Sequence, residues 1–451
     1  MRPRPEGRHL FGTRFLRAAA VALVVAALWL RPASAEEILR DTEIENGIRT
    51  LATPIWRVAG LDPVGMGIYI VSDKDLNSFV AGGQAIFLNS GLILRAEVPN
   101  MLIGVVAHET GHIAGGHILR SLEAVKNASV ETIIALAAAL GASVAGGNGA
   151  PLIAAAGVGQ RAFMSFSVAQ EATADHAAMN YLDRSGQSAR GLLRFFEVLQ
   201  ANEPLTGEPT DPWARTHPLT SQRIDYIRHH VETSRFSNVP DPPDFVALLK
   251  RIQIKLRAFL DNPSTTLRAY PESDQSPDAR CARAIAYYRF PNLNKAVPMI
   301  DGLIRDFPAN PYYRELKGQM LFENGRIREA MAPYEEAVKL APQSALIRIS
   351  LAQAYIESND PTLNKRAIAY LNAAAQTEGR EGTLWRLLAT AYGRDNQLGM
   401  AALSLAEEAL ADGKKKDAQQ QAQRAKQNLP RNTAFYARAE EIQREAKESD
   451  D

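Results

Sequence analysis

The chain has 451 residues, 46% of them hydrophobic and 22% charged, a composition that favours two or three folded domains and excludes disorder over most of the length. Beyond residue 35 the net charge is −4, which argues against a nucleic-acid partner. The single cysteine, Cys281, excludes an intramolecular disulfide framework and a cysteine-rich zinc ribbon.

The first 35 residues have the pattern of an export signal. Five arginines precede an apolar run from Ala18 to Leu30, and the small residues at 33–35 suit cleavage by a signal peptidase. The run has 13 residues, whereas a helix needs about 20 to cross a bilayer, so a retained membrane anchor is the weaker interpretation. We therefore expect residues 1–35 to be removed and the mature protein to be periplasmic.

The remaining sequence changes character twice. Short apolar or alternating runs at Ile68–Val71 and Ala85–Leu94 predict strands and a turn, and helical periodicity begins at Asn100 and continues to the C-terminus. Prolines gather between residues 237 and 278 around one amphipathic helix near Phe245–Leu260, which predicts a linker. We expect a first domain at 36–237, a linker at 238–277, a second domain at 278–445 and a polar tail at 446–451.

The second domain contains an internal repeat. Pro308 and Pro342 are 34 residues apart, and each is preceded by an alanine 12 residues earlier, Ala296 and Ala330. A spacing of 34 residues is the period of tetratricopeptide helix pairs. Looser matches downstream indicate four units, or five at most. An unspecialised helical bundle is the alternative. Stacked helix pairs form a concave surface that usually binds other polypeptides.

The segment His108-Glu109-Thr110-Gly111-His112 places two histidines at i and i+4 on one helix face, where their neutral ring nitrogens can bind one zinc ion. Glu109 lies beside such a metal, where its carboxylate can take a proton from water. The alternative is a pair of histidines on an ordinary polar helix face. Four glycines in this predicted helix argue against it, because each costs up to about 1 kcal/mol relative to alanine unless a neighbour approaches closely.

A catalytic zinc site needs a third protein ligand, and two residues compete for this role. His117 follows His112 by five residues, which on a continued helix places it about 140° away from the metal-facing side. Glu171 shares a predicted helix face with Asp175, so that helix can offer one carboxylate to the metal and another to the second ring nitrogen of a zinc-bound histidine. A solvated helix face is the alternative for this pair, although its alanine-rich neighbours disfavour full exposure.

Three motifs together resemble one known family. HExxH at 108–112, ExxAD at 171–175 and the segment Thr216-His217-Pro218 followed by Arg223 are similar to the M48 zinc metallopeptidases, the HtpX-like and CaaX prenyl protease-like family. With the export signal and the repeats, the chain looks most similar to the periplasmic type of this family that enhances β-barrel assembly. Thr173 departs from the pattern, since a second glutamate often stands there, and Gly115-Gly116 is unusually permissive.

The resemblance implies roles for several residues. His108, His112 and Glu171 would bind one Zn²⁺ per chain, and Glu109 would be the catalytic base. His217 would lie near the metal, where it either stabilises the oxyanion or caps the open metal position in a resting form, and Arg223 matches a family arginine. The last group of residues resembles the family strand that precedes the catalytic helix. A substrate would pair with the edge of this strand as an additional β-strand. The residues are Asn77, Ser78, Phe79, Gly82 and Gly83.

The expected fold is mainly α with a small β-sheet, a zincin-like metallopeptidase domain followed by an α-helical tetratricopeptide solenoid. We expect an endopeptidase for misfolded or misassembled envelope proteins, whose repeats recruit substrate or the outer-membrane assembly machinery. A periplasmic chaperone or adaptor with a latent peptidase domain is the alternative, whereas a small-molecule hydrolase would leave the repeats without a use. The apolar segments 132–145 and 151–159 predict a buried helical hairpin or a flap that makes peripheral membrane contact over 132–159.

Overall fold

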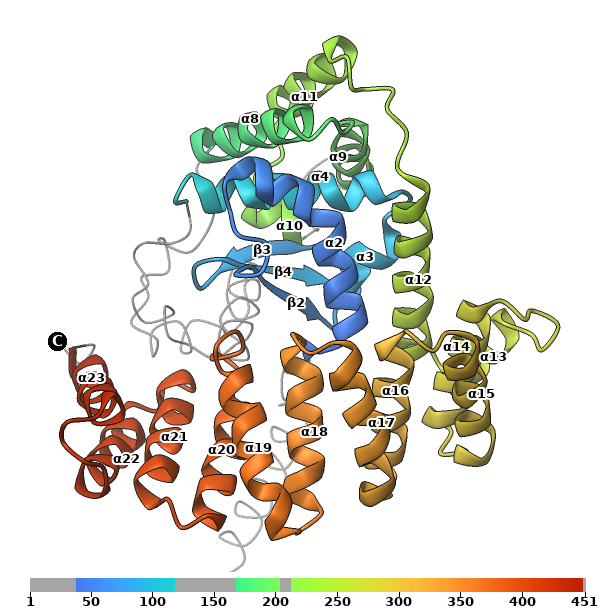
Figure 1. Ribbon diagram of the computed structural model, residues 1–451. Coiled ribbons are helices and arrows are strands. Elements are labelled where there is room, and N and C mark those ends of the chain that lie inside the picture. The colour runs from blue at the N-terminus through green and yellow to red at the C-terminus, as the bar shows by residue number, and fades with distance from the viewer. Residues whose placement is uncertain (1–37, 118–167, 203–211, 449–451) are drawn as a thin grey trace, which may run out of the picture.

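The computed structural model describes residues 38–117, 168–202 and 212–448 (Figure 1). The expected export signal, the apolar segments at 132–159 and the last three residues of the tail lie outside these ranges. Within the described ranges, none of the helices combines the length and the apolar character needed to span a lipid bilayer.

A four-stranded sheet lies at the centre of the first domain, in the order β1-β2-β4-β3. Its strands are β1 (Ile38–Leu39), β2 (Gly67–Val71), β3 (Ser78–Ala81) and β4 (Ala85–Asn89). β2 pairs parallel with β4, and β3 pairs antiparallel with β4, so β3 forms one edge of the sheet. Within the run Ala85–Leu94 the strand ends at Asn89, and the chain turns where Ser90 and Gly91 both donate hydrogen bonds to the carbonyl oxygen of Asp73. The rest of the run is helix α3 (Ser90–Arg95) and not a further strand.

Helices cover the sheet and enclose the central helix α4 (Pro99–Ala114), which carries HExxH and is buried over nearly its whole length (Figure 1). The others in this domain are α2 (Thr42–Ala59), α8 (Val168–Arg184), α9 (Arg190–Asn202), α10 (Pro212–Thr216) and α11 (Ser221–Thr233). The glycines of α4 allow close approach: a Cβ on Gly111 would lie 2.8 Å from the carbonyl oxygen of Ala174 in α8, and one on Gly104 would lie 2.9 Å from the backbone nitrogen of Leu192 in α9. Gly116, with φ 64°, follows the end of the helix.

The expected linker is a structural bridge. Its amphipathic helix is α12 (Pro243–Leu260), and a second short helix, α13 (Pro263–Ala269), follows it. Leu249, Ile252 and Leu256 of α12 belong to the core of the first domain, whereas Ile254 and Ala258 belong to the core of the first repeats. Because one helix contributes to both cores, α12 fixes the solenoid to the first domain.

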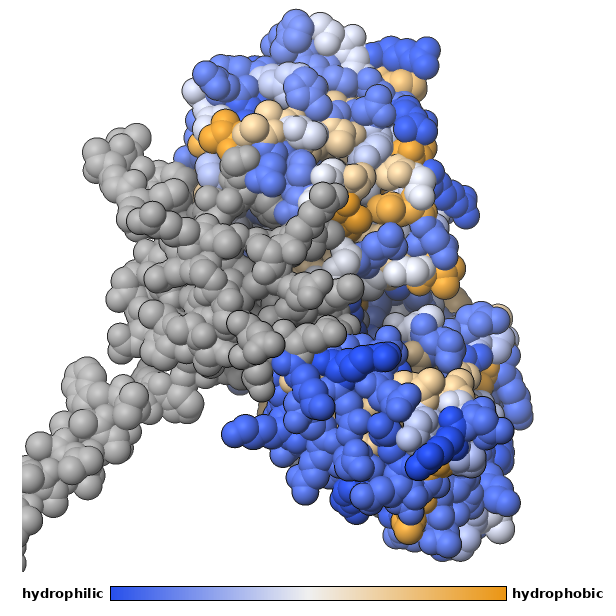
Figure 2. Space-filling model, turned by 90° about the vertical axis from the view of Figure 1, so that its left-hand side faces the viewer, coloured by the Kyte–Doolittle hydropathy of each residue, from blue (hydrophilic) through white to orange (hydrophobic). Residues whose placement is uncertain are grey.

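The C-terminal half is an arc of five antiparallel helix pairs among the described residues (Figure 1). The pairs are α14 (Pro277–Arg289) with α15 (Leu293–Asp306), α16 (Pro311–Glu323) with α17 (Ile327–Leu340), α18 (Ala345–Glu357) with α19 (Pro361–Ala374), α20 (Gly382–Arg394) with α21 (Leu398–Ala411), and α22 (Lys415–Asn428) with α23 (Ala434–Glu448). Gly318 of α16 lies against the ring of Tyr334 of α17, which explains the small residue at that repeat position. The part of the solenoid visible in Figure 2 is mostly hydrophilic. The predicted mainly α fold with a small sheet and a C-terminal repeat solenoid is confirmed.

Ion pairs join the two halves near the start of the described chain. Arg40 lies 2.9 Å from Glu378 and 2.6 Å from Glu381 of the solenoid. Lys255 of α12 lies 2.7 Å from Asp41 and 3.0 Å from Glu43. The interface therefore buries several charges of both signs.

Candidate metal centre

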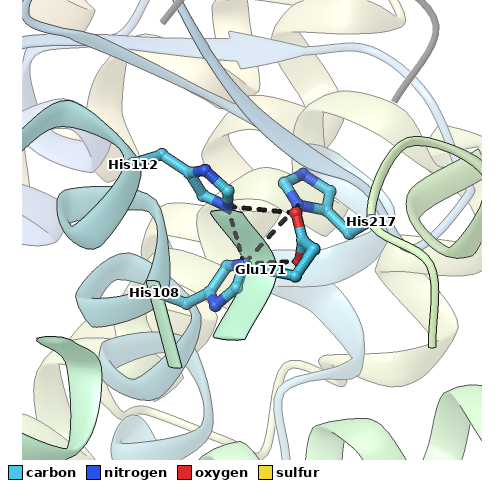
Figure 3. Close-up of side chains that lie close together, drawn as sticks. All are labelled: His108, His112, Glu171 and His217. Carbon is cyan, nitrogen blue, oxygen red and sulfur yellow. Dashed lines mark hydrogen bonds and ion pairs between the residues drawn. The ribbon is translucent and has the colours of Figure 1, made fainter. Parts of the chain in front are cut away.

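Four fully buried side chains lie close together (Figure 3). They are His108 and His112 of α4, Glu171 of α8, and His217, the residue that directly follows α10. One possible ligand atom from each lies within 4.8 Å of all the others. His112 Nε2 is 3.1 Å from His108 Nε2 and 3.3 Å from Glu171 Oε1. Three imidazoles and one carboxylate are donors typical of zinc, so the residues fit a single zinc ion.

Charged side chains behind this cluster fix its orientation. Asp175 Oδ1 lies 2.9 Å from His108 Nδ1, and a carboxylate at Nδ1 selects the tautomer whose Nε2 is free to bind a metal. Arg223 in turn contacts both oxygens of Asp175, at 2.6 and 2.9 Å, and its Nη1 lies 2.8 Å from Glu171 Oε2. Arg223 therefore positions one proposed ligand directly and another through Asp175.

The pKa values of the ionisable groups in the cluster are shifted in different directions. Against the effect of burial, hydrogen bonds with Asp175 and Glu171 raise the pKa of His108 to about 9. Burial, reinforced by the neighbouring charges of His108 and His217, lowers the pKa of His112 to about 2. Burial tends to raise the pKa of Glu171, but His217, His108 and His112 hold that pKa well below its ordinary value. An ionised Glu171 therefore lies beside a neutral His112, both in the protonation states that bind metal, whereas His108 must release a proton before its Nε2 can do so.

Glu109 lies beside the cluster, where the HExxH spacing predicts the base. Its Oε1 accepts a hydrogen bond of 2.7 Å from the hydroxyl of Ser78 on β3, and His217 Nε2 lies 3.7 Å from the same oxygen. Glu109 and Ser78 are both fully buried. The contact with Ser78 escaped the sequence analysis, in which Ser78 is only part of the expected edge strand.

His217 completes the cluster. Its Nδ1 lies 3.0 Å from Glu171 Oε1 and 3.5 Å from His108 Nε2. Its ring stacks on the buried ring of Trp213 in α10, with centroids 4.6 Å apart and an interplanar angle of 16°. Sequence reasoning missed Trp213, although a tryptophan four residues before His217 is the kind of signal that could have revealed it.

His117, the rival third ligand, lies outside the cluster. Its Nδ1 is 3.3 Å from Nδ1 of His112, on the side of that ring opposite the Nε2 atom that faces His108 and Glu171. His117 is also partly exposed. The structure therefore gathers Glu171, and not His117, with the two motif histidines.

The expected substrate-binding residues surround the edge strand β3. Ser78 and Phe79 belong to it, Asn77 immediately precedes it, and Gly82 and Gly83 form the turn to β4 with positive φ values of 60° and 95°. β4 and α3 separate this strand from α4, so β3 precedes the HExxH helix in sequence but not directly.

The part of the chain that holds this cluster matches a known protein family. Residues 39–231 match Peptidase family M48. The chain is 27% identical over 253 residues to the putative beta-barrel assembly-enhancing protease of Vibrio cholerae serotype O1, covering 54% of this chain and 52% of that protein. It is 22% identical over 384 residues to the beta-barrel assembly-enhancing protease of Yersinia pestis, covering 82% of this chain and 77% of that protein. A crystal structure of a thermophilic TPR protein from Thermus thermophilus covers 37% of this chain and 98% of its own, with 14% identity and a TM-score of 0.22.

Proposed function

Because residues 39–231 match Peptidase family M48, we propose that the chain is a zinc-dependent endopeptidase that hydrolyses polypeptides of the bacterial envelope. The observation that carries the proposal is the convergence of His108, His112 and Glu171 beside the buried carboxylate of Glu109. The expected export signal and the names of the relatives support an envelope location, which we propose to be the periplasm.

In this proposal each residue has a distinct task. His108, His112 and Glu171 would hold one zinc ion, which when bound supplies a Lewis acid for hydrolysis. Glu109 accepts the proton of the attacking water and returns it to the leaving amine. The Ser78 hydroxyl donates a hydrogen bond to Oε1 of Glu109. The other oxygen, Oε2, has no hydrogen-bond partner among the described residues and is available to accept the proton.

We further propose that this conformation is a resting form closed by His217. Its ring lies next to Glu171 and His108 and would take the fourth position around a bound zinc ion. A substrate would have to displace the ring from that position. Movement of His217 would open the site, after which its imidazole could stabilise the oxyanion. His217 lies between the short helix α10 and helix α11, which gives its backbone more freedom than that of residues within α4.

The proposed substrates are misfolded or misassembled envelope proteins, whose extended segments would pair along the edge of β3. The solenoid would recruit them, or an outer-membrane assembly partner, on its concave face. The names of the curated relatives, which refer to β-barrel assembly, support this partner class. Peripheral membrane contact through 132–159 stays a prediction.

The closed position of His217 also favours a second candidate, a chaperone or adaptor whose peptidase site is largely latent. Zinc analysis of the mature protein, combined with digestion of casein, separates the two. We expect about one zinc per chain and measurable digestion. A zinc-loaded protein that suppresses aggregation but digests nothing would favour the adaptor.

Glu109→Gln tests the base in the same assay. The amide is nearly isosteric but cannot accept the proton, so zinc content should be unchanged and turnover should fall by at least about 10². The matched control is Glu97→Gln, which alters an exposed glutamate paired with Arg194 and should digest casein at the wild-type rate. Undiminished turnover in Glu109→Gln would remove the base assignment.

A further inference from the structure

The edge strand β3 has contacts on both of its faces. On the inner face, the Ser78 hydroxyl donates to Glu109 Oε1 at 2.7 Å. On the outer face, Phe79 stacks on Phe87 of β4 with centroids 4.7 Å apart, and Phe87 stacks on Tyr69 of β2 at 5.0 Å. These residues are register partners, so their rings form a row across the sheet from β3 to β2.

The row of rings ends at an arginine that belongs to the domain interface. The guanidinium carbon of Arg40 lies 5.0 Å from the centroid of the Tyr69 ring. Arg40 also pairs with Glu378 and Glu381, which lie in the loop between α19 and α20 (residues 375–381). In Figure 1 the ends of α19 and α20 that this loop joins point toward the sheet. Through this loop and Arg40, the solenoid therefore contacts the outer face of the sheet, the face that carries the row of rings.

The same loop also contacts the turn between β3 and β4. Arg380 Nη2 donates a hydrogen bond to the carbonyl oxygen of Gly82. Gly82 has φ 60°, and a Cβ at this position would overlap the guanidinium, so the contact depends on glycine. The indole nitrogen of Trp385 donates to the carbonyl oxygen of Gly379 at 2.7 Å, which holds the loop in place.

We propose that Arg380 and Ser78 are positioning residues of the peptidase site: the α19–α20 loop of the solenoid fixes the β3–β4 hairpin, and the hairpin orients Glu109 through Ser78. The inference rests on the proposed peptidase function for its catalytic part only. It provides a route by which a polypeptide bound to the repeats changes the position of the base without touching a metal ligand.

The properties of β3 make such control physically reasonable. The strand has four residues and pairs only with β4 among the described strands. Short edge strands open more easily than central ones, because half of their backbone groups lack a strand partner. Contacts from outside the sheet therefore decide how well β3, and with it the Ser78 hydroxyl, is ordered.

The structural part is tested by amide hydrogen exchange in the full-length, zinc-loaded protein. Arg380→Ala should increase the exchange rate of residues 78–84 by about tenfold and leave that of β2 unchanged. A tenfold change is about the smallest expected for the loss of a hydrogen bond made by a charged group. The matched control is Arg326→Ala, which removes an exposed arginine paired with Glu329 inside the solenoid. Because exchange needs no substrate, this result is independent of whether the protein is a protease.

The catalytic part is tested by steady-state kinetics on a short unstructured peptide. Ser78→Ala should lower kcat about tenfold, with KM and zinc content unchanged, because the hydroxyl holds the base and not the substrate. Ser78→Thr keeps the hydroxyl and should restore most of kcat, which a purely structural role would not predict. Arg380→Ala should lower kcat in the same direction by a smaller factor.

Each outcome decides one part. Wild-type exchange in the hairpin of Arg380→Ala overturns the contact from the solenoid, and wild-type kcat in Ser78→Ala overturns the link to the base. A wild-type protein that binds zinc and cleaves nothing contradicts the proposed function but leaves the exchange result valid. If Arg380→Ala does not fold, the double variant Glu378→Gln, Glu381→Gln breaks the Arg40 pairs of the same loop and allows the same exchange comparison.

Discussion

The metal cluster and the domain interface both bury charged groups, but the pKa values of their carboxyl groups shift differently. In the cluster, the pKa values of Glu171 and Asp175 are lowered: burial opposes this shift, but the surrounding histidines and Arg223 outweigh it. At the interface, burial raises the pKa of Glu45 to about 7 despite Arg40, and burial reinforced by Asp41 raises that of Glu315 to about 8. Glu43 is the exception there, because Lys255 and Arg251 lower its pKa against the effect of burial.

The difference shows what each region is built to do. Carboxylates that are more acidic than usual stabilise a fixed arrangement of positive or metal-binding partners. Carboxylates that are less acidic than usual leave the contact between domains sensitive to its surroundings. The predictions below test the cluster first, where the largest effects are expected, and the interface last.

Loss of a ligand should have the largest effect. Glu171→Ala removes the carboxylate that faces both motif histidines. Loss of a residue that only supports a metal ligand lowers metal affinity by up to about 100-fold, so loss of a ligand itself should lower zinc affinity by more than that. His117→Ala, the matched control, should change it by less than about twofold, because the side chain lies outside the cluster. Competition with a chromophoric chelator measures both. The reverse order would transfer the third ligand to His117.

Replacement of His217 tests whether the cluster is closed at rest. In His217→Ala we expect X-ray absorption to report one fewer nitrogen ligand, and peptide cleavage to be at least as fast as in the wild type where gating limits the rate. If His217 serves only the oxyanion, cleavage should slow by about 10²–10³ instead. His176→Ala, which alters a histidine that contacts Tyr226, is the control. An unchanged coordination sphere would contradict gating.

The sequence predicts those parts of the site that depend on local helix geometry. His108 and His112 share a face because of their spacing alone, and Glu171 and Asp175 do so in the same way. The repeat period likewise predicts the helix pairs, and the glycines of α4 indicate the close packing found at Ala174.

The contacts that the sequence did not predict join segments far apart in the chain. Ser78 meets Glu109 across 31 positions, and Arg380 meets Gly82 across 298. No periodicity relates such residues, and a serine or an arginine in these places is equally compatible with solvent. The amphipathic helix of the expected linker was predicted from its periodicity, but its contribution to two cores was not, because those cores form only after folding.

A smaller effect is expected where the cluster depends on close backbone packing. Gly111→Ala would place a methyl group 2.8 Å from the carbonyl oxygen of Ala174 and force α4 and α8 apart, which should lower the free energy of unfolding by about 1–3 kcal/mol. Gly393→Ala in α20 is the control, because no atom lies within 4 Å of its added Cβ, and it should stabilise the protein slightly. Equal melting temperatures for the two variants would contradict the packing argument.

The smallest effect concerns pH at the domain interface. Glu315 accepts a hydrogen bond from Thr42 and faces Asp41, Glu43 and Lys255. Its pKa in the folded protein, about 8, exceeds the ordinary value of 4.5, so the folded state holds this proton more tightly than the unfolded state. The resulting stability is fully present below about pH 4.5 and is lost as pH rises through about 8.

Glu315→Gln removes this dependence, because the amide does not ionise. The variant should therefore melt about 2–4 °C above the wild type at pH 8, the shift that corresponds to roughly 1 kcal/mol, and close to it at pH 5. Glu329→Gln, an exposed glutamate of the solenoid, should follow the wild-type profile at both pH values. If the melting temperature of Glu315→Gln changes with pH as it does in the wild type, the interface tolerates an ionised Glu315. The contrast with the metal cluster would then rest on Glu45 alone.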